Sequence, residues 1–160
     1  MKRSLLLIVV LVAANGVIAQ AQQPKKIPRI GYMTGVGSAP NKGFLQGLRD
    51  LGYVEGKNIL IEFRTTEGKS EGHAELAAEL VRLKVDVIVA DTAGEVTAAK
   101  NATTTIPIVM RGVADPIALG LVASLAHPGG NITGIATLAP DLSGKRLELL
   151  KEVIPKLSRV

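Results

Sequence analysis

The sequence predicts an α/β fold: a doubly wound parallel five-stranded sheet with helices between the strands. Short runs rich in β-branched residues begin near positions 29, 59, 85, 106 and 132. The stretches between them carry apolar residues at helical spacing. Strand starts about 21–30 residues apart are typical of βαβ units, whose right-handed crossovers build a parallel sheet. With 160 residues, 47% of them hydrophobic and 21% charged, the chain can bury a core.

The first elements follow from alternating strand and helix patterns. Residues 27–33 are expected to form a strand, residues 41–51 a helix and residues 59–63 a second strand. One face of the helix carries Phe44, Leu45, Leu48 and Leu51. Gly52 directly follows this run and is expected to end the helix.

The middle of the chain repeats the pattern. Ser70 is expected to cap a second helix. Its predicted buried face consists of Ala74, Leu76, Ala77, Leu80, Val81 and Leu83. The apolar, β-branched run over 85–90 is typical of a strand buried on both faces. A third helix is expected over 94–101.

The last third supplies two strands and two helices. Strands are expected over 106–110 and 132–136. Asp115 and Pro116 suit a helix start, because Asp caps and Pro is pre-organised at the first helical position. The inner face of this helix would carry Ile117, Leu121, Val122 and Leu125. A final amphipathic helix is expected over 143–154, with Leu147, Leu150 and Ile154 on one side.

Residues 1–21 have the order of a secretory signal peptide. A basic start at Lys2 and Arg3 precedes an apolar run over 5–14 and the small-residue motif Ala19-Gln20-Ala21. The run is shorter than the roughly 20 residues of a membrane span. We therefore expect export to the periplasm, with cleavage before Gln22. Loss of Lys2 and Arg3 would lower the formal net charge of +5 by two.

Composition excludes several kinds of site. Without cysteine, the chain has no disulfide, thiolate metal site or Cys nucleophile. Two isolated histidines, His73 and His127, make a metal site improbable. Scattered basic residues and an aromatic content of 2% do not favour nucleic-acid binding. The nucleotide-binding and nucleophile-elbow signatures are absent, so we expect no cofactor and no catalytic residues.

Polar residues follow the predicted strands, at the sheet edge where ligands bind in such folds. These strand-end positions are Thr34, Gly35, Gly37, Ser38, Asp91, Thr92, Ala93, Arg111, Gly112, Asp115 and Thr137. Thr92 and Ala93 would begin a helix, whose free N–H groups suit an anion such as a carboxylate. Ordinary turn chemistry uses the same residue types, and Asp115 can equally be a helix cap.

Several stretches together resemble a known family. They include Gly43 to Asn58, the run from Asp115 to Gly134 with its Pro-Gly-Gly-Asn-Ile-Thr-Gly ending, and Leu142 to Glu152. The chain resembles the periplasmic substrate-binding proteins of ABC transporters, of the tryptophan/tyrosine-uptake type. The resemblance implies one lobe of a type I periplasmic binding protein fold. It also implies an amino acid-like ligand held between two lobes, and a membrane permease as partner.

The resemblance also implies site residues and domain limits. The ligand-binding residues it implies are Thr34, Ser38, Asp91, Thr92, Ala93 and Asp115. Thr92 and adjacent amides would hold a ligand carboxylate, and Asp115 would fix the ammonium or order its loop. Family members are roughly twice as long as this chain. Residues 22–140 would thus be the N-terminal lobe, and residues 141–160 the crossover and first helix of a missing second lobe.

Two other functions remain open at this stage. A secreted small α/β hydrolase would need a nucleophile and a base at the strand ends, and no Ser/His/Asp constellation is visible there. The effector-binding domain of a regulator shares the fold. The export signal and the lack of a DNA-reading helix-turn-helix segment argue against that alternative.

Overall fold

The computed structural model describes residues 26–35, 41–66, 72–137 and 142–155, and it confirms the predicted parallel sheet. The five strands are β1 (Arg29–Thr34), β2 (Leu60–Thr65), β3 (Val87–Ala90), β4 (Ile108–Ala114) and β5 (Ile132–Thr137). They lie in the order β2-β1-β3-β4-β5, and every neighbouring pair is parallel. The predicted signal segment, residues 1–21, lies outside the described residues.

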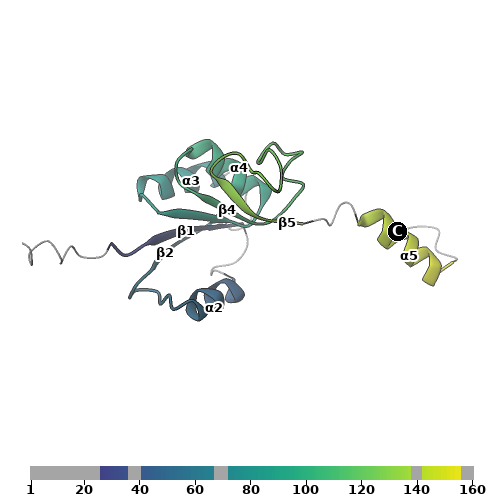
Figure 1. The fold of residues 1–160 in the computed structure, drawn as a ribbon, viewed down its shortest axis with the longest axis horizontal. Helices are drawn as coiled ribbons and strands as arrows, with labels where there is room; N and C mark the ends of the chain where they lie inside the picture. The colour runs from purple at the N-terminus through teal and green to yellow at the C-terminus, as the bar shows by residue number, and fades with distance from the viewer. Residues whose placement is uncertain (1–25, 36–40, 67–71, 138–141, 156–160) are drawn as a thin grey trace, which may run out of the picture.

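Helices lie on both faces of the sheet (Figure 1). The helix α2 (Lys42–Asp50) covers one face, and α3 (His73–Arg82) and α4 (Ala93–Ala102) cover the other. Alternate residues of each strand therefore enter two different cores. The larger core, on the α3 and α4 side, includes Met33, Leu80, Ile88, Val96, Ile108 and Met110. The smaller, on the α2 side, consists of Ile30, Tyr32, Ile59 and Val89, with Phe44 and Leu48 packed against it.

The first helix begins and ends as its sequence predicts. The Asn41 side chain accepts a hydrogen bond from the Gly43 N–H at 2.8 Å and so caps α2. Gly52 follows the helix with a φ of +83°, which suits glycine. The expected burial of Leu51 is wrong, because this side chain is 77% exposed. The turn of chain that ends the helix carries Leu51 beyond the edge of the smaller core.

The helix α3 packs on the sheet through a narrower face than predicted. Ala77 and Leu80 are its buried residues, whereas Ala74 is exposed. Leu80 lies directly over Gly31, where an added Cβ would meet its side chain at 2.8 Å. The helix begins after Gly72, which makes no side-chain cap. The predicted cap Ser70 lies outside the described residues.

The segment after β4 is not the predicted helix. Residues 116–120 form a turn, and the chain from there to residue 131 is irregular. Asp115 and Gly120 adopt φ values of +42° and +64°, which interrupt a helical path. The N–H groups of Leu121 and Val122 both donate to the Pro116 carbonyl, so the chain folds back on itself.

Burial in this segment therefore differs from the helical expectation. Leu121 and Val122 are buried as predicted, but Ile117 and Leu125 are 46% and 55% exposed. The two buried side chains join the larger core. Ile117 and Leu125 lie in an irregular loop, which has no apolar face to pack on the core.

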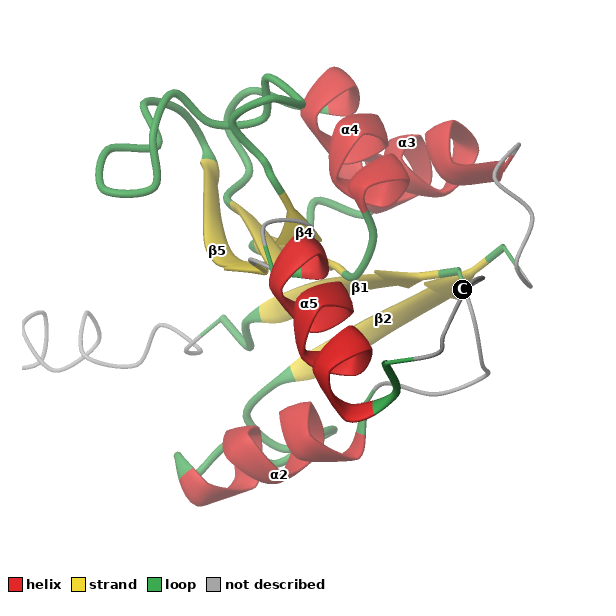
Figure 2. Ribbon diagram, turned by 90° about the vertical axis from the view of Figure 1, so that its right-hand side faces the viewer, coloured by secondary structure: helices red, strands yellow, loops and turns green. Residues whose placement is uncertain are grey.

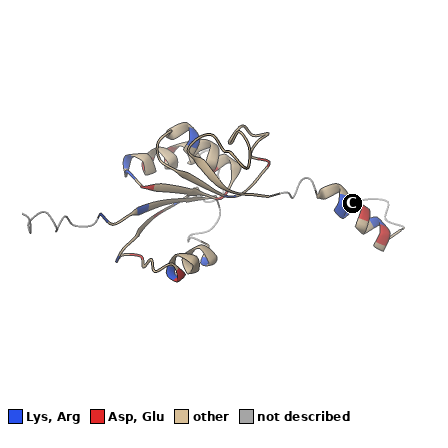
Figure 3. Ribbon diagram, in the orientation of Figure 1, with Lys and Arg blue, Asp and Glu red and all other residues tan. Residues whose placement is uncertain are grey.

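The predicted final helix is present as α5 (Ser143–Val153). Every residue from 142 to 155 is exposed, including the predicted inner-face residues Leu147, Leu150 and Ile154. In Figure 1 the helix stands apart from the sheet, beyond β5, and Figure 3 shows basic and acidic residues alternating along it. Within the described ranges, no helix has the length and apolar character of a membrane span.

Candidate functional site

The carboxyl ends of the strands meet at one edge of the sheet, because all five strands are parallel. Figure 2 shows the same sheet turned by 90°, with α3 and α4 above the strands and α2 below them. β3 ends at Ala90, so Asp91 is the first residue beyond it. Ala90 pairs with Met110, which places Asp91 beside Arg111 of the neighbouring strand β4. Two oppositely charged side chains thus share the edge.

Asp91 and Arg111 form a two-point ion pair. The Arg111 Nε atom lies 2.6 Å from Asp91 Oδ1, and Nη2 lies 2.8 Å from Oδ2. The Asp91 side chain is 14% exposed and that of Arg111 is 39% exposed. Hydrogen bonds to this carboxylate raise the pKa of the Arg111 guanidinium above its ordinary value. Arg111 is therefore a fixed positive charge at a partly open edge.

Tyr32 supports this pair from within the smaller core. Its ring is fully buried, and its hydroxyl lies 3.1 and 3.2 Å from the two Asp91 oxygens. Burial raises the pKa of the Tyr32 hydroxyl, and the Asp91 carboxylate raises it further. The hydroxyl consequently stays protonated and donates to Asp91. Three neighbouring strands, β1, β3 and β4, are thereby joined at the edge.

An irregularity in β4 lies directly beside Arg111. The pairing of β4 with β5 runs from Arg111 opposite Ile135 to Val113 opposite Ala136, so Gly112 is an extra residue on β4. Gly112 has a φ of +95°, which glycine adopts without strain. Such bulges bend a strand locally and re-aim the adjacent side chain. The bulge comes directly after Arg111, whose own register places it beside Asp91 as in a regular strand.

The N-terminus of α4 continues the site from Asp91. Thr92 caps the helix by accepting from the Glu95 N–H at 3.3 Å. Glu95 Oε2 in turn accepts from the N–H groups of Asp91 and Thr92, at 2.8 and 2.9 Å. These two amides are occupied, so the first-turn amides left for an anion are those of Ala93 and Gly94. Thr92 itself is exposed.

Glu95 is a buried carboxylate behind this helix start. Its side chain is 1% exposed, and Oε1 lacks a hydrogen-bond partner among the described residues. The nearest basic group is His73 Nε2 on α3, 4.0 Å from Oε1. Sequence reasoning missed Glu95, although the Thr92-x-x-Glu95 spacing is the signature of a capping box.

The predicted site residues are only partly brought together. Asp91, Thr92 and Ala93 are consecutive, and Thr34 ends the parallel strand β1 at the same edge, where it is 7% exposed. Asp115 lies four residues beyond Arg111, and its Oδ1 accepts from the Ala118 N–H at 3.0 Å, which is a capping contact. Ser38 lies outside the described residues. Arg111 is one of the predicted strand-end positions, but its pairing with Asp91 was not predicted.

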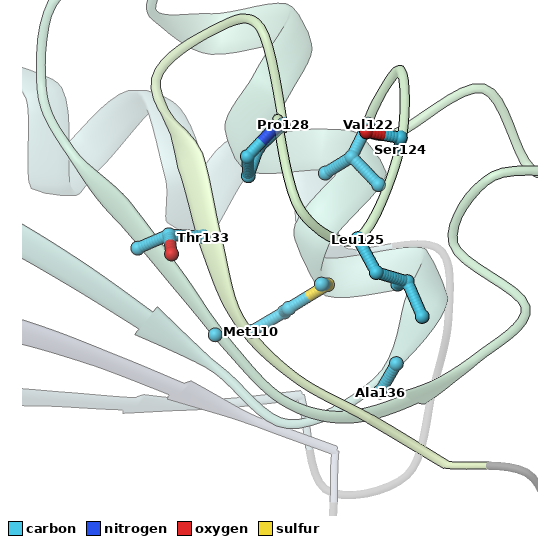
Figure 4. A pocket seen from close by; sticks show the side chains of 8 residues that line it. Met110, Val122, Ser124, Leu125, Pro128, Thr133 and Ala136 are labelled. Carbon is cyan, nitrogen blue, oxygen red and sulfur yellow. The ribbon is translucent and has the colours of Figure 1, made fainter.

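A separate cavity of about 320 Å³ lies between β4, β5 and the irregular segment (Figure 4). Its lining is largely apolar: Met110, Val122, Ser124, Leu125, Pro128, Thr133, Gly134 and Ala136. None of the predicted site residues that the structure describes contributes to it. Met110 belongs to the larger core, and the alternation of a strand directs its neighbour Arg111 to the opposite face. The described residues hold no group of three or more His, Asp or Glu side chains that could bind a metal ion.

Comparison with known proteins gives consistent matches in sequence. Residues 37–160 match the family described as ABC transporter substrate binding protein. A protein of Clostridioides difficile (strain R20291), named tyrosine-binding protein, is 41% identical over 120 residues. That alignment covers 74% of this chain but 34% of the relative, so the chain spans about a third of that relative's length.

Solved structures agree with the sequence matches. The ABC domain from Streptococcus pneumonia in complex with L-Trp is similar with a TM-score of 0.64 and 31% identity, covering 69% of this chain and 39% of that one. A conserved domain protein from Vibrio cholerae is similar with a TM-score of 0.75 and 34% identity, covering 82% and 45%. In both, the similarity is to less than half of the solved chain.

Proposed function

Because the chain belongs to the family of ABC transporter substrate-binding proteins, we propose that it is the ligand-contacting N-terminal lobe of an importer's solute-binding component. The observation that carries the proposal is the Arg111–Asp91 pair beside the exposed start of α4. It places a fixed charge and unused helix amides at the edge where parallel α/β sheets bind ligands. The family is one of binding proteins, and we propose no catalysis.

The ligand class we propose is a free amino acid or a close relative of one. The relative named as a tyrosine-binding protein and the neighbour solved with L-Trp support an aromatic side chain. In this proposal Thr34, Ser38, Asp91, Thr92, Ala93 and Asp115 surround the ligand. The Ala93 amide at the helix start suits a carboxylate, and the Asp115 carboxylate suits an ammonium group.

Domain limits and location belong to the same proposal. Residues 22–140 form the lobe, and residues 141–160 lead toward a second lobe that the longer relatives have room for. The basic start, apolar run and Ala-x-Ala motif over residues 1–21 support export to the periplasm, with cleavage before Gln22. A membrane permease would receive the ligand from the closed two-lobed form.

Calorimetric titration of residues 22–160 with tryptophan, tyrosine, phenylalanine and branched-chain amino acids tests the proposal. A single lobe contacts the ligand from one side only, so we expect weak binding with preference for an aromatic side chain. Tight binding by this lobe alone would refute the need for a second lobe. Failure to bind any of them, or hydrolysis of generic esters that is lost on substitution of one serine, would overturn the proposal.

A further inference from the structure

The guanidinium of Arg111 has a second edge that Asp91 does not use. Arg carries five N–H donors in a rigid plane. The described contacts with Asp91 run from Nε and Nη2, the lateral edge of the group. The Tyr32 hydroxyl also interacts with the guanidinium. None of the hydrogen bonds among the described residues runs from Nη1, so Nη1 and Nη2 offer a parallel pair of N–H bonds on the end edge. That end geometry matches the two oxygens of a carboxylate.

Asp91, by contrast, is saturated. Its two oxygens accept from Arg111 at 2.6 and 2.8 Å and from the Tyr32 hydroxyl at 3.1 and 3.2 Å. Its own backbone N–H donates to Glu95. A ligand ammonium would have to displace Arg111 to reach this carboxylate. Asp91 is therefore placed to hold Arg111 and is poorly placed to bind a cation.

The direction of Arg111 is set before any ligand arrives. The register of β3 and β4 places Arg111 beside Asp91, and the two-point contact with Asp91 fixes the plane of its guanidinium. The fully buried Tyr32 anchors Asp91 in turn. A long side chain that is already ordered loses little conformational freedom on binding. The Arg111 side chain is 39% exposed, so solvent reaches part of it.

We propose that Arg111 determines the specificity of this site for a carboxylate, which its free end edge receives beside the first-turn amides of α4. Asp91 and Tyr32 are positioning residues for Arg111. The inference rests on the proposed function, since it names the group of the ligand that the same edge recognises. It predicts that carboxylate recognition outweighs ammonium recognition on this lobe.

Three indole probes separate these two groups. L-Tryptophan carries both, 3-indolepropionate carries only the carboxylate, and tryptamine carries only the ammonium. Binding to the purified chain is followed by amide shifts in ¹H–¹⁵N NMR spectra, which detect weak association. We expect the two carboxylates to bind with shifts at residues 91–94 and 111, and tryptamine to bind at least about tenfold more weakly.

Variants then assign the effect to Arg111. Arg111→Gln is expected to weaken L-tryptophan and 3-indolepropionate by about tenfold or more while leaving tryptamine unchanged. Arg111→Lys keeps the positive charge but lacks the planar guanidinium, so it should restore part of the lost carboxylate binding. It also replaces Arg111→Gln as the test if that variant fails to fold. Arg49→Gln, on the exposed α2, removes the same charge elsewhere and should change nothing.

The possible failures are distinguishable. Unchanged binding of the two carboxylates by Arg111→Gln or Arg111→Lys would overturn the role of Arg111, and so would an equal loss of binding for all three probes. In either case, L-tryptophan binding by the parent chain would still support the proposed function. Tryptamine binding as strong as that of L-tryptophan would also overturn the inference. No response of the parent chain to any probe would overturn the inference and the proposed function together.

Discussion

Replacing Glu95 with alanine should destabilise the fold at the start of α4, next to the candidate site. The substitution removes the acceptor for the Asp91 and Thr92 N–H groups, at 2.8 and 2.9 Å. Each buried donor left without a partner costs roughly 1–3 kcal/mol. Removing a buried carboxylate with one unpartnered oxygen offsets part of this cost. Thr92 is exposed, so water can also reach the vacated amides. We therefore expect a net loss of about 2–3 kcal/mol.

Two variants provide the controls for this value. Glu95→Gln keeps one acceptor oxygen but loses the charge that favours a helix N-terminus, so it should cost about 1 kcal/mol. Glu75 occupies the corresponding first-turn position of α3, where Gly72 makes no side-chain cap, and it is exposed. Glu75→Ala should therefore stay within about 0.5 kcal/mol of the parent chain.

Urea denaturation followed by far-UV circular dichroism measures these differences as free energies of unfolding. Amide hydrogen exchange at Asp91 and Thr92 provides a local check, since both should exchange faster in Glu95→Ala. The reasoning would be refuted by a Glu95→Ala chain as stable as the parent, or by an equal loss in Glu75→Ala. Either result would show that the buried capping box contributes no more than an exposed first-turn acid.

Three further substitutions test other parts of the fold in the same denaturation assay. Gly134→Ala should cost about 3 kcal/mol or more, because its Cβ would lie 2.0 Å from a β4 carbonyl oxygen and its φ is +134°. Gly47→Ala, inside α2 with open space around the added Cβ, should stabilise by about 0.5–1 kcal/mol. Lys26 and the Arg29 N–H hold the pKa of Asp86 below its usual value. Asp86→Asn should therefore lose stability at neutral pH, by less than about 1 kcal/mol because the pair is exposed, and the difference should vanish as the pH falls through that lowered pKa.

Each of these three has an outcome that contradicts it. Gly130→Ala, in a loop with open space around the added Cβ, is the control for Gly134, and an equal small effect of both would disprove the close approach of β5 to β4. If Gly47→Ala destabilised the chain, the added methyl group would have to clash with a neighbour, although the structure shows open space there. A difference between Asp86→Asn and the parent that grows toward acid would have the wrong sign for a lowered carboxyl pKa.

The sheet was predictable because its strands are coded by local composition. The β-branched run Val85 to Ala90 and the spacing of the other strands are visible without any knowledge of contacts. The helix predicted from Asp115 to Leu125 is wrong. The apolar residues there have helical spacing, but the backbone conformation of the segment prevents a helix. Asp115 and Gly120 adopt left-handed conformations, and the Pro116 carbonyl collects two N–H groups that a helix would use elsewhere. Apolar periodicity alone does not weigh these local preferences.

The site was predictable in position but not in pairing. The rule that parallel strands present their carboxyl ends at one edge predicts that Thr34 and Asp91, which come from different strands, lie at the same edge. The Asp91–Arg111 contact depends on β3 and β4 being neighbours and on their register. None of these is visible in the residues of either strand alone. The capping box at Thr92 and Glu95 is different, since its spacing was readable and would have shown that two amides are already occupied.

Tyr32 explains why this edge can hold its charges in place. Its ring packs against Phe44 and Phe63 at centroid distances of 5.1 and 5.9 Å, so a phenylalanine would fill the same space in the smaller core. The hydroxyl adds a donor that reaches the end of the neighbouring strand and meets Asp91. A buried hydroxyl without a partner would cost stability, and the Asp91 carboxylate supplies that partner. The order of the core and the direction of Arg111 are therefore set by the same contacts, and the charged edge is an extension of the packed sheet.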